Sequence, residues 1–250
     1  MIPLLPGPEF LPRLPELLSR DQEFAALHPI TPELVAAVCR FGYMPMSLGA
    51  ERPDILLVKC HAQRMVLELS DLHVPRNLPR YARGLTVEVD RHFSAVLGEI
   101  DRYHGESWIS PPLAQALQVL HERPVHGVMV HSVEVCDPLA PEGSPPVAAE
   151  IGYSVGQVYT SLSGYHTRNG SGWVQMVALA RLLERGTAAF WDLGMDIPYK
   201  RRLGARPVER KEFLRRYHRA AGSGEGSPNP LHEDGPRGPL PAHELVSRRP

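Results

Sequence analysis

The sequence predicts an α+β protein in three parts: a small N-terminal α/β domain over residues 1–68, a larger domain over residues 69–220 and a disordered tail over residues 221–250. Three observations support this. Short apolar runs typical of strands alternate with longer segments whose apolar residues recur at helical spacing. With 250 residues, 43% of them hydrophobic, the chain can bury the cores of a medium and an accessory domain. From Ala221 onward, Gly, Pro and Ser dominate and apolar residues are too few to offset the ordering entropy.

The N-terminal domain begins with MIPLLPGPEFLPRLPELL, which is apolar, broken by prolines and without a basic start. This composition predicts an arm that packs on the surface rather than a secretory signal. A helix follows, with Thr31 as N-cap and Pro32 at its first position, and Gly42 ends it. We expect strands at Ile55–Val58 and Met65–Leu69 to complete the domain.

The larger domain reads as an alternation of strands and helices. Strands are predicted at Leu85–Val89, Gly127–Cys136, Val147–Ser154, Gln157–Leu162 and Thr187–Trp191. Helices are predicted at 92–103, from Pro111 through Leu120, at 170–185 and at Glu209–His218.

Composition limits the function. A formal net charge of -1 argues against a general nucleic-acid binder but leaves room for a local basic patch. The 12 histidines are scattered and no Cys/His cluster occurs, so we expect no metal site. The three cysteines, Cys39, Cys60 and Cys136, are odd in number and far apart, which indicates reduced thiols and a cytoplasmic protein. No apolar run approaches the roughly 18–20 residues of a membrane span.

One basic cluster stands out in HVPRNLPRYARG. Arg76, Arg80 and Arg83 are spaced by four and three residues, so they would share one face if Asn77–Arg83 were helical. Such a row of guanidinium groups suits phosphate oxygens, which arginine binds in bidentate fashion. Taken alone, the spacing favours a merely solvated helix face.

Two further segments have both a functional and a purely structural interpretation. Trp108 precedes a proline-started helix, where it could stack on a base or line a pocket, or pack in the core. The loop SLSGYHTRNGSG, residues 161–172, joins a strand to a helix. Its glycines would let an anion approach the helix N-terminus, or would simply form the turn.

Asp192 ends an apolar strand, and its simplest role is to hydrogen-bond the loop that follows. The spacing of residues assembles no Ser–His or Cys–His array around it. His166 is the histidine near these segments that could act as a base.

A set of short motifs then occurs in a specific order along the chain. They are Gly42-Tyr43-Met44-Pro45, His73-Val74-Pro75-Arg76 with Arg80 and Arg83, Ser107-Trp108-Ile109-Ser110, His131-Ser132-Val133-Glu134-Val135, Ser163-Gly164-Tyr165, Asp192 and Leu203-Gly204-Ala205. In this order they resemble the leucyl/phenylalanyl-tRNA–protein transferase family, over roughly residues 28–217.

The resemblance implies a GNAT-like acyltransferase domain after the N-terminal domain. It also implies a monomeric, cytoplasmic, cofactor-free enzyme that moves Leu or Phe from aminoacyl-tRNA to the N-terminal amine of an acceptor protein, marking that protein for degradation by the N-end rule. By this resemblance Arg76, Arg80 and Arg83 hold the tRNA, Asp192 is the active-site aspartate and Trp108 lies near the terminal adenosine. The remaining substrate-binding residues are expected to be Leu162, Ser163, Tyr165 and His166.

The chain departs from the family pattern on the acceptor side. Gly194 stands where the family has Gln, and Ser161-Leu162 stands where it has Gly-Glu. The missing carboxylate predicts a weaker preference for acceptors that start with Arg or Lys. Three alternatives follow: acceptor choice differs, the proton relay is rebuilt with Tyr165, His166 or Asp196, or activity is lost.

Two other functions therefore remain open. One is a GNAT-type enzyme with an acyl-CoA donor, for which the loop around Gly170 would have to bind phosphate. The other is a non-catalytic relative that binds tRNA or peptide.

Overall fold

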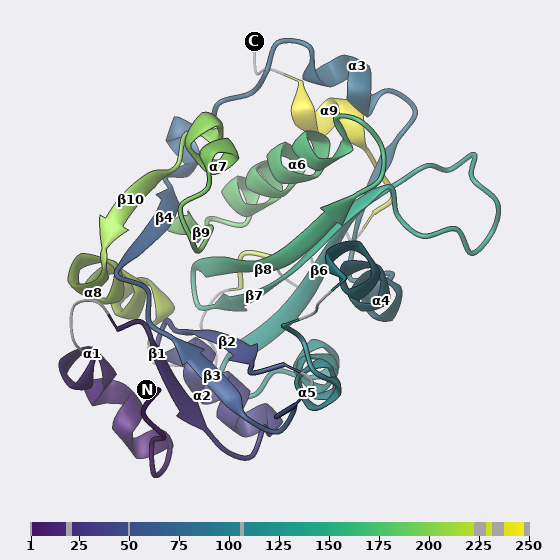
Figure 1. The fold of residues 1–250 in the computed structure, drawn as a ribbon. Coiled ribbons are helices and arrows are strands. Elements are labelled where there is room, and N and C mark those ends of the chain that lie inside the picture. The colour runs from purple at the N-terminus through teal and green to yellow at the C-terminus, as the bar shows by residue number, and fades with distance from the viewer. Residues whose placement is uncertain are drawn as a thin grey trace.

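The computed structural model describes residues 2–18, 22–49, 51–105, 108–222, 229–231 and 238–247. It confirms the α+β class: helices cover both faces of an eight-stranded sheet, and a three-stranded sheet lies beside it (Figure 1). No helix in these ranges combines the length and the hydropathy that crossing a bilayer requires.

The large sheet positions the site. Its strands run in the order β10 (Arg206–Glu209), β4 (Gln63–Leu67), β9 (Phe190–Asp192), β8 (Val158–His166), β7 (Ala148–Val155), β6 (Val128–Cys136), β5 (Thr86–Val89) and β11 (Leu240–Pro241). All neighbours are antiparallel except β8 and β9, which pair in parallel over Val158–Thr160 only. Beyond Thr160, β8 continues to His166 with β7 on one side and no described strand on the other.

The small sheet contains β1 (Phe24–Leu27), β3 (Leu56–Lys59) and β2 (Met44–Ser47). The sequence predicted β3 and β4 together in the N-terminal domain, but β4 lies inside the large sheet. One apolar core runs from Leu27 and Val58 to Val130 and Ile151, which joins the two sheets. The domain boundaries themselves stay a prediction.

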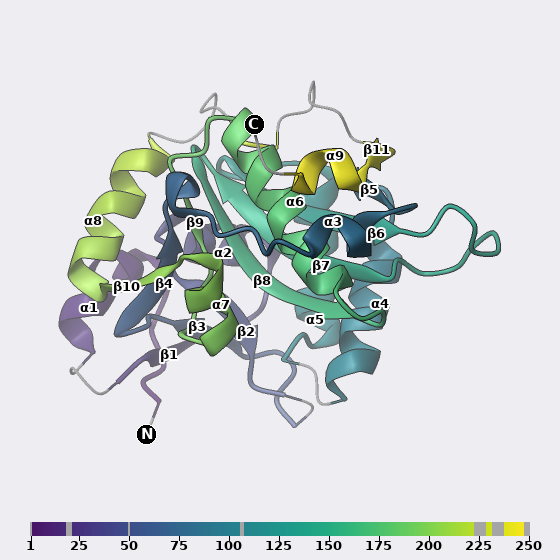
Figure 2. The same cartoon turned by 90° about the horizontal axis from the view of Figure 1, so that it is seen from above.

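Two apolar cores lie on opposite faces of the large sheet (Figures 1 and 2). One face carries α6 (Ser171–Arg185), α3 (Leu78–Ala82), α7 (Pro198–Leu203) and α9 (Ala242–Val246). The other carries α2 (Pro32–Arg40), α4 (Phe93–His104), α5 (Pro111–Glu122) and α8 (Arg210–Ala221). The N-terminal arm forms η1 (Pro8–Arg13) and α1 (Leu14–Leu17), and η2 is Leu69–Asp71. The arm packs as expected, because Leu11 and Leu14 are fully buried.

The predicted helices and strands occur within a few residues of their expected bounds. Thr31 caps α2 by accepting a hydrogen bond from the Leu34 backbone N–H at 3.1 Å. The strand expected to end at Leu162 runs on to His166, because the ladder with β7 continues through Ser163 and Gly164. Short elements such as β1, β2, α7 and β10 are missed, since each has too few residues to show a period.

Part of the tail that the sequence predicted to be disordered is ordered in the structure. Residues 223–228, 232–237 and 248–250 lie outside the described residues, but Leu240–Pro241 pairs with β5 and the helix α9 follows. Ala242, Leu245 and Val246 are buried against the core that contains α6. The composition of the whole tail hides these few apolar residues, and the docking surface that covers them is formed far away in the sequence.

This docking makes Leu245 a stabilising residue. Leu245→Ala should lower the free energy of unfolding by about 2–5 kcal/mol, because it removes buried methyl groups and leaves a cavity. Urea unfolding followed by circular dichroism measures the change. Leu139→Ala is the matched control, because Leu139 is 90% exposed and its loss should cost less than about 0.5 kcal/mol. Equal effects of the two substitutions would show that α9 does not stabilise the fold.

Candidate functional site

The main cavity of the described chain has a volume of about 890 Å³ and lies where β8 extends beyond β9. Ser161–His166 of β8 form one wall, and the start of α6 forms another. The connection from β9 to α7 and the segment that leads into α3 complete it. The end of the shorter parallel strand thus leaves room for a ligand beside the longer one.

The cavity wall is mainly aromatic and aliphatic, with a few polar groups. Its large apolar side chains include Tyr81, Tyr103, Trp108, Leu162, Trp173 and Met176. Glu150, Gln175 and Lys200 are buried polar residues of this wall, and Ser161 is half-buried. Small-molecule and substrate sites usually have this composition: an apolar lining with a small number of placed polar groups.

All five residues predicted to contact substrate line this cavity: Trp108, Leu162, Ser163, Tyr165 and His166. Trp108 satisfies both of its interpretations, because it lines the cavity and also packs against the core. The hydroxyl of Tyr165 donates to the Pro146 carbonyl oxygen at 3.0 Å, which occupies its proton and fixes the ring.

Asp192 lies behind the cavity wall and is absent from its lining. Its side chain is fully buried and forms a two-point ion pair with Arg64, in which Nε donates to Oδ1 at 3.0 Å and Nη2 donates to Oδ2. The Thr160 hydroxyl also donates to Oδ2, at 3.0 Å, and the Gly194 N–H donates to Oδ1 at 2.9 Å. Both carboxylate oxygens are therefore engaged within the protein.

Arg64 is a functional neighbour that the sequence analysis missed, because 128 residues separate it from Asp192. Its Nη1 donates to Nδ1 of His61 at 2.9 Å, and its guanidinium lies 4.8 Å from the centre of the Phe213 ring. Burial and the charge of Arg64 lower the pKa of His61, so that ring stays neutral. Arg64 thereby ties β4 to β9 and α8.

Gly194 occupies the position where the family resemblance led us to expect a glutamine. Its φ of +74° is a left-handed backbone conformation, which favours glycine over a larger side chain. A Cβ atom there would lie 3.0 Å from Cε of Met44, another residue of the cavity wall. The absent side chain therefore leaves cavity space. Asp196, offered as a substitute, pairs with Arg201 and does not line this cavity.

Glu150 on β7 is a cavity residue that no motif indicated. It is 6% exposed, and both of its oxygens accept from the Ser161 hydroxyl, Oε1 at 2.9 Å and Oε2 at 3.1 Å. Oε1 also accepts from the Tyr159 hydroxyl at 2.9 Å. Burial raises the pKa of Glu150 to about 7, against the effect of these hydrogen bonds. Its signal in the sequence was a charged residue inside an apolar strand.

Lys200 provides a cation on the opposite wall. Its Nζ donates to the backbone carbonyl oxygens of Leu193 and Met195, the latter at 3.1 Å. Burial lowers the pKa of Lys200 to about 8, although Asp192 and Glu150 oppose the shift. The ammonium group thus holds the β9–α7 connection in place while it lines the cavity.

The predicted arginine row is only partly helical. Helix α3 spans Leu78–Ala82, so Arg80 lies within it while Arg76 and Arg83 lie outside, and the single helical face is not formed. All three side chains are exposed. They alternate along the chain with residues of the cavity wall, among them Pro75, Asn77 and Tyr81. None of the three arginines lines the cavity itself, although each lies next to or within two residues of one that does.

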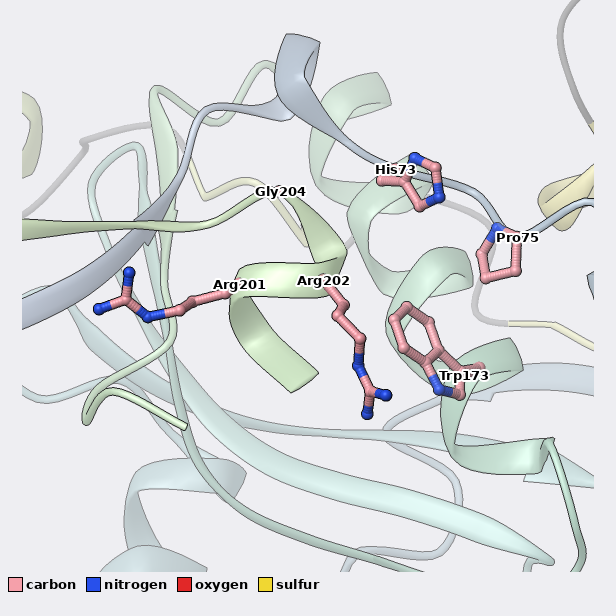
Figure 3. Close-up of a pocket in the computed structure, with 6 residues that line it drawn as sticks. All are labelled: His73, Pro75, Trp173, Arg201, Arg202 and Gly204. Carbon is pink, nitrogen blue, oxygen red and sulfur yellow. The ribbon is translucent and has the colours of Figure 1, made fainter. Parts of the chain in front are cut away.

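A second cavity of about 560 Å³ adjoins the first and shares Pro75, Trp173 and Arg202 with it. Figure 3 shows its six lining residues, with Arg201 pointing away from the other side chains toward its partner Asp196. Within the part of the chain that the structure describes, Arg202 forms no salt bridge. Its guanidinium is thus available to an anion.

The start of α6 also borders the main cavity, through Gly170 and Gly172. Gly170 has a φ of +79°, and a Cβ atom there would lie 2.5 Å from the Tyr81 ring. Glycine is therefore required for the turn itself. Ser171 Oγ donates to backbone carbonyl oxygens rather than capping α6.

One group of metal-binding residue types occurs among the described residues. Glu88, His92 and Cys136 each place one potential ligand atom within 4.8 Å of the others. They lie on or next to the paired strands β5 and β6, and none of them lines the cavity. Structural zinc sites use four ligands, whereas this group offers three.

Comparison with known proteins gives a consistent result. The family model described as "Leucyl/phenylalanyl-tRNA protein transferase" matches residues 66–218. A leucyl/phenylalanyl-tRNA–protein transferase of Rubrobacter xylanophilus is 33% identical over 201 residues, which cover 76% of this chain and 95% of that protein. Another, from a Jannaschia species, is 28% identical over 74% of this chain and 82% of its own length. Among solved structures, a GCN5-related N-acetyltransferase from Kribbella flavida is 13% identical with a TM-score of 0.35, over 80% of this chain and 42% of that one.

The buried ion pair predicts a large stability effect at Asp192. Asp192→Asn should lower the free energy of unfolding by about 3–5 kcal/mol, because it leaves the charge of Arg64 buried without its partner. Asp196→Asn is the matched control in the same connection, since the Asp196–Arg201 pair is exposed and should contribute about 0–1 kcal/mol. Urea unfolding measures both variants. A loss at Asp192 no larger than that at Asp196 would contradict the structural role of the pair.

Proposed function

The chain belongs to the leucyl/phenylalanyl-tRNA–protein transferase family, and we propose that it transfers leucine or phenylalanine from its tRNA to the N-terminal α-amine of an acceptor protein. The observation that carries this proposal is the cavity beside β8, which combines an apolar lining with buried polar groups and the guanidinium group of Arg202. We further propose that the enzyme works as a cytoplasmic monomer without a cofactor and marks its acceptors for degradation by the N-end rule.

The reaction is the aminolysis of an ester. The aminoacyl ester is already activated, so the protein has to orient the two substrates, provide a neutral amine and stabilise the oxyanion that forms at the carbonyl carbon. An enclosed site also excludes water, which would otherwise hydrolyse the ester.

The donor fits the apolar part of the site. The side chain of leucine or phenylalanine would lie against the wall that Trp108 and Leu162 help to form. The exposed guanidinium groups of Arg76, Arg80 and Arg83 would bind phosphates of the tRNA at the mouth. Arg202 and Trp173, which border both cavities, would meet its terminal nucleotides.

Lys200 and Asp192 would have different roles in the reaction. Lys200 is the cation of the cavity wall, and its ammonium group would stabilise the developing oxyanion. Asp192 would act as a positioning residue. Its carboxylate binds the Gly194 N–H, and its ion pair with Arg64 fixes the end of β9, from which the connection to α7 along the cavity begins. We assign this indirect role to the expected active-site aspartate because both of its oxygens are engaged within the protein.

The function is tested by offering the purified protein labelled Leu-tRNA, Phe-tRNA and acetyl-CoA, each with peptides of different N-termini. We expect transfer from aminoacyl-tRNA to free N-terminal amines, with a weak preference for Arg or Lys, because Leu162 removes the expected carboxylate. An N-acetylated peptide is the control and should accept nothing. Transfer from acetyl-CoA alone would establish the acyl-CoA alternative, and transfer from no donor would leave a binding protein.

The arginine assignment gives a second test. Replacing Arg76 and Arg80 by Ala should weaken tRNA binding and reduce the slope of log Kd against log salt by about 2, because each phosphate contact releases about one counterion. Fluorescence anisotropy of labelled tRNA over a range of NaCl concentrations measures the slope. Arg123→Ala, at the exposed end of α5, is the control and should leave the slope unchanged. An unchanged slope in the double variant would refute the assignment.

A further inference from the structure

The acceptor side of the site lacks a carboxylate at position 162 but has one on the neighbouring strand. Glu150 pairs in register with Gly164 of β8, two residues beyond Leu162, and it lines the same cavity. The residues of the main cavity wall include no other carboxylate. A negative charge is therefore available beside the free edge of β8, although no motif places it there.

Neutral hydrogen-bond donors surround Glu150 and hold its carboxylate in one orientation. Trp191 Nε1 donates to Ser161 Oγ at 2.9 Å, which turns the serine hydroxyl toward Glu150. Oε1 accepts from both Ser161 and Tyr159 at 2.9 Å, whereas Oε2 accepts from Ser161 at 3.1 Å. Gln175 of α6 lies beside Glu150 and lowers its pKa. These groups form a fixed polar corner in an otherwise apolar wall.

The titratable groups that face Glu150 are few. Tyr159 approaches it from β8, and Lys200 and Tyr199 approach it from α7. The element α6 contributes the uncharged Gln175, and β6 places Val133 at the paired position. Since burial raises the pKa of Glu150 to about 7, the carboxyl group gains and loses a proton near neutral pH. General bases work best when their pKa lies near the working pH.

We propose that Glu150 is a catalytic residue that receives the N-terminal α-ammonium group of the acceptor protein and takes its proton. This role rests on the proposed function, since it assigns the acceptor half of that same site. Asp192 and Asp196 lie outside the cavity lining, and their carboxylates pair with Arg64 and Arg201. Tyr165 uses its hydroxyl proton on Pro146. Glu150 thereby replaces the proton relay sought near Asp192.

The proposed step balances without a co-reactant. Glu150 takes one proton from the ammonium group, and the neutral amine attacks the ester carbonyl carbon to form the new C–N bond. The C–O bond to the ribose of the tRNA then breaks, and the ribose oxygen receives the second proton that the nitrogen gives up. Glu150 releases its own proton to solvent, so that the turnover yields an amide, free tRNA and one proton.

The test is the pH dependence of kcat/KM for Leu-tRNA transfer to a peptide, in wild type and Glu150→Gln. Wild type should show a rising limb near pH 7 from Glu150 in addition to the titration of the peptide amine. Glu150→Gln should lose the first limb and about 10²–10⁴-fold in kcat/KM, the usual contribution of a general base. Peptides whose amines differ in pKa separate the two limbs, because only the amine limb moves with the peptide.

Glu134→Gln is the matched control. Glu134 lies on β6 next to Val133, is also buried with a pKa raised to about 7 by burial, and does not line the cavity. Because its neighbour Val133 pairs with Glu150, the two glutamates point to opposite faces of the sheet. Its amide variant should keep the limb near pH 7. Glu150→Asp, which retains a carboxylate, should keep a limb at a reduced rate.

Folding is checked on the same variants. Glu150→Gln should unfold in urea at pH 8 no earlier than wild type: a buried carboxyl with a raised pKa loses stability as pH rises, and the amide avoids that loss. A wild-type rate that Glu150→Gln matches over the whole pH range would overturn the role of Glu150 alone. Absence of transfer by wild type would overturn the proposed function, and the role of Glu150 with it.

Discussion

The ion pair between Arg64 and Asp192 is the contact on which the site depends. It joins the start of β4 to the end of β9, and its carboxylate also accepts from the Gly194 N–H and the Thr160 hydroxyl. Removing two charges from water costs several kcal/mol, and a two-point geometry with further hydrogen bonds repays that cost. The pair therefore favours one position of the strand end over all others, and the β9–α7 connection that lines the cavity begins from that position.

The cavity itself follows from unequal strand lengths. β9 pairs with β8 over three positions and then turns into α7, while β8 runs on to His166. A sheet edge left free inside the protein, with N–H and C=O groups and alternating side chains, is suited to bind an extended chain end. Tyr81 and Trp173 close the space from the α6 side, and Trp108 closes it near α5. The donor and the acceptor would thus meet at the point where the parallel pair ends.

The charged residues of the site differ in their burial and in their hydrogen-bond partners. Asp192 is paired with the Arg64 guanidinium and accepts from two further donors, so its role is structural. Glu150 accepts from uncharged donors in a desolvated position, which raises its pKa toward neutrality and leaves it able to exchange a proton. Lys200 stands between these cases, because it holds two backbone carbonyl groups while it remains part of the cavity wall. The surroundings of Asp192 and Glu150 alone therefore give these two acidic residues different roles.

The sequence by itself determined the α+β class, the order and approximate bounds of the longer helices and strands, the family and the five cavity residues from Trp108 to His166. These features depend on local periodicity, capping residues and motif order, all of which can be read from residues close together in the sequence. The tertiary structure alone decided that Arg64 neutralises Asp192, that Glu150 faces the cavity and that α9 packs on the core. Each of these depends on residues far apart in the chain, and no local spacing specifies which strand lies beside which. Asp192 shows the distinction most clearly: its place at a strand end was evident, but its burial and its partner came from strand pairing.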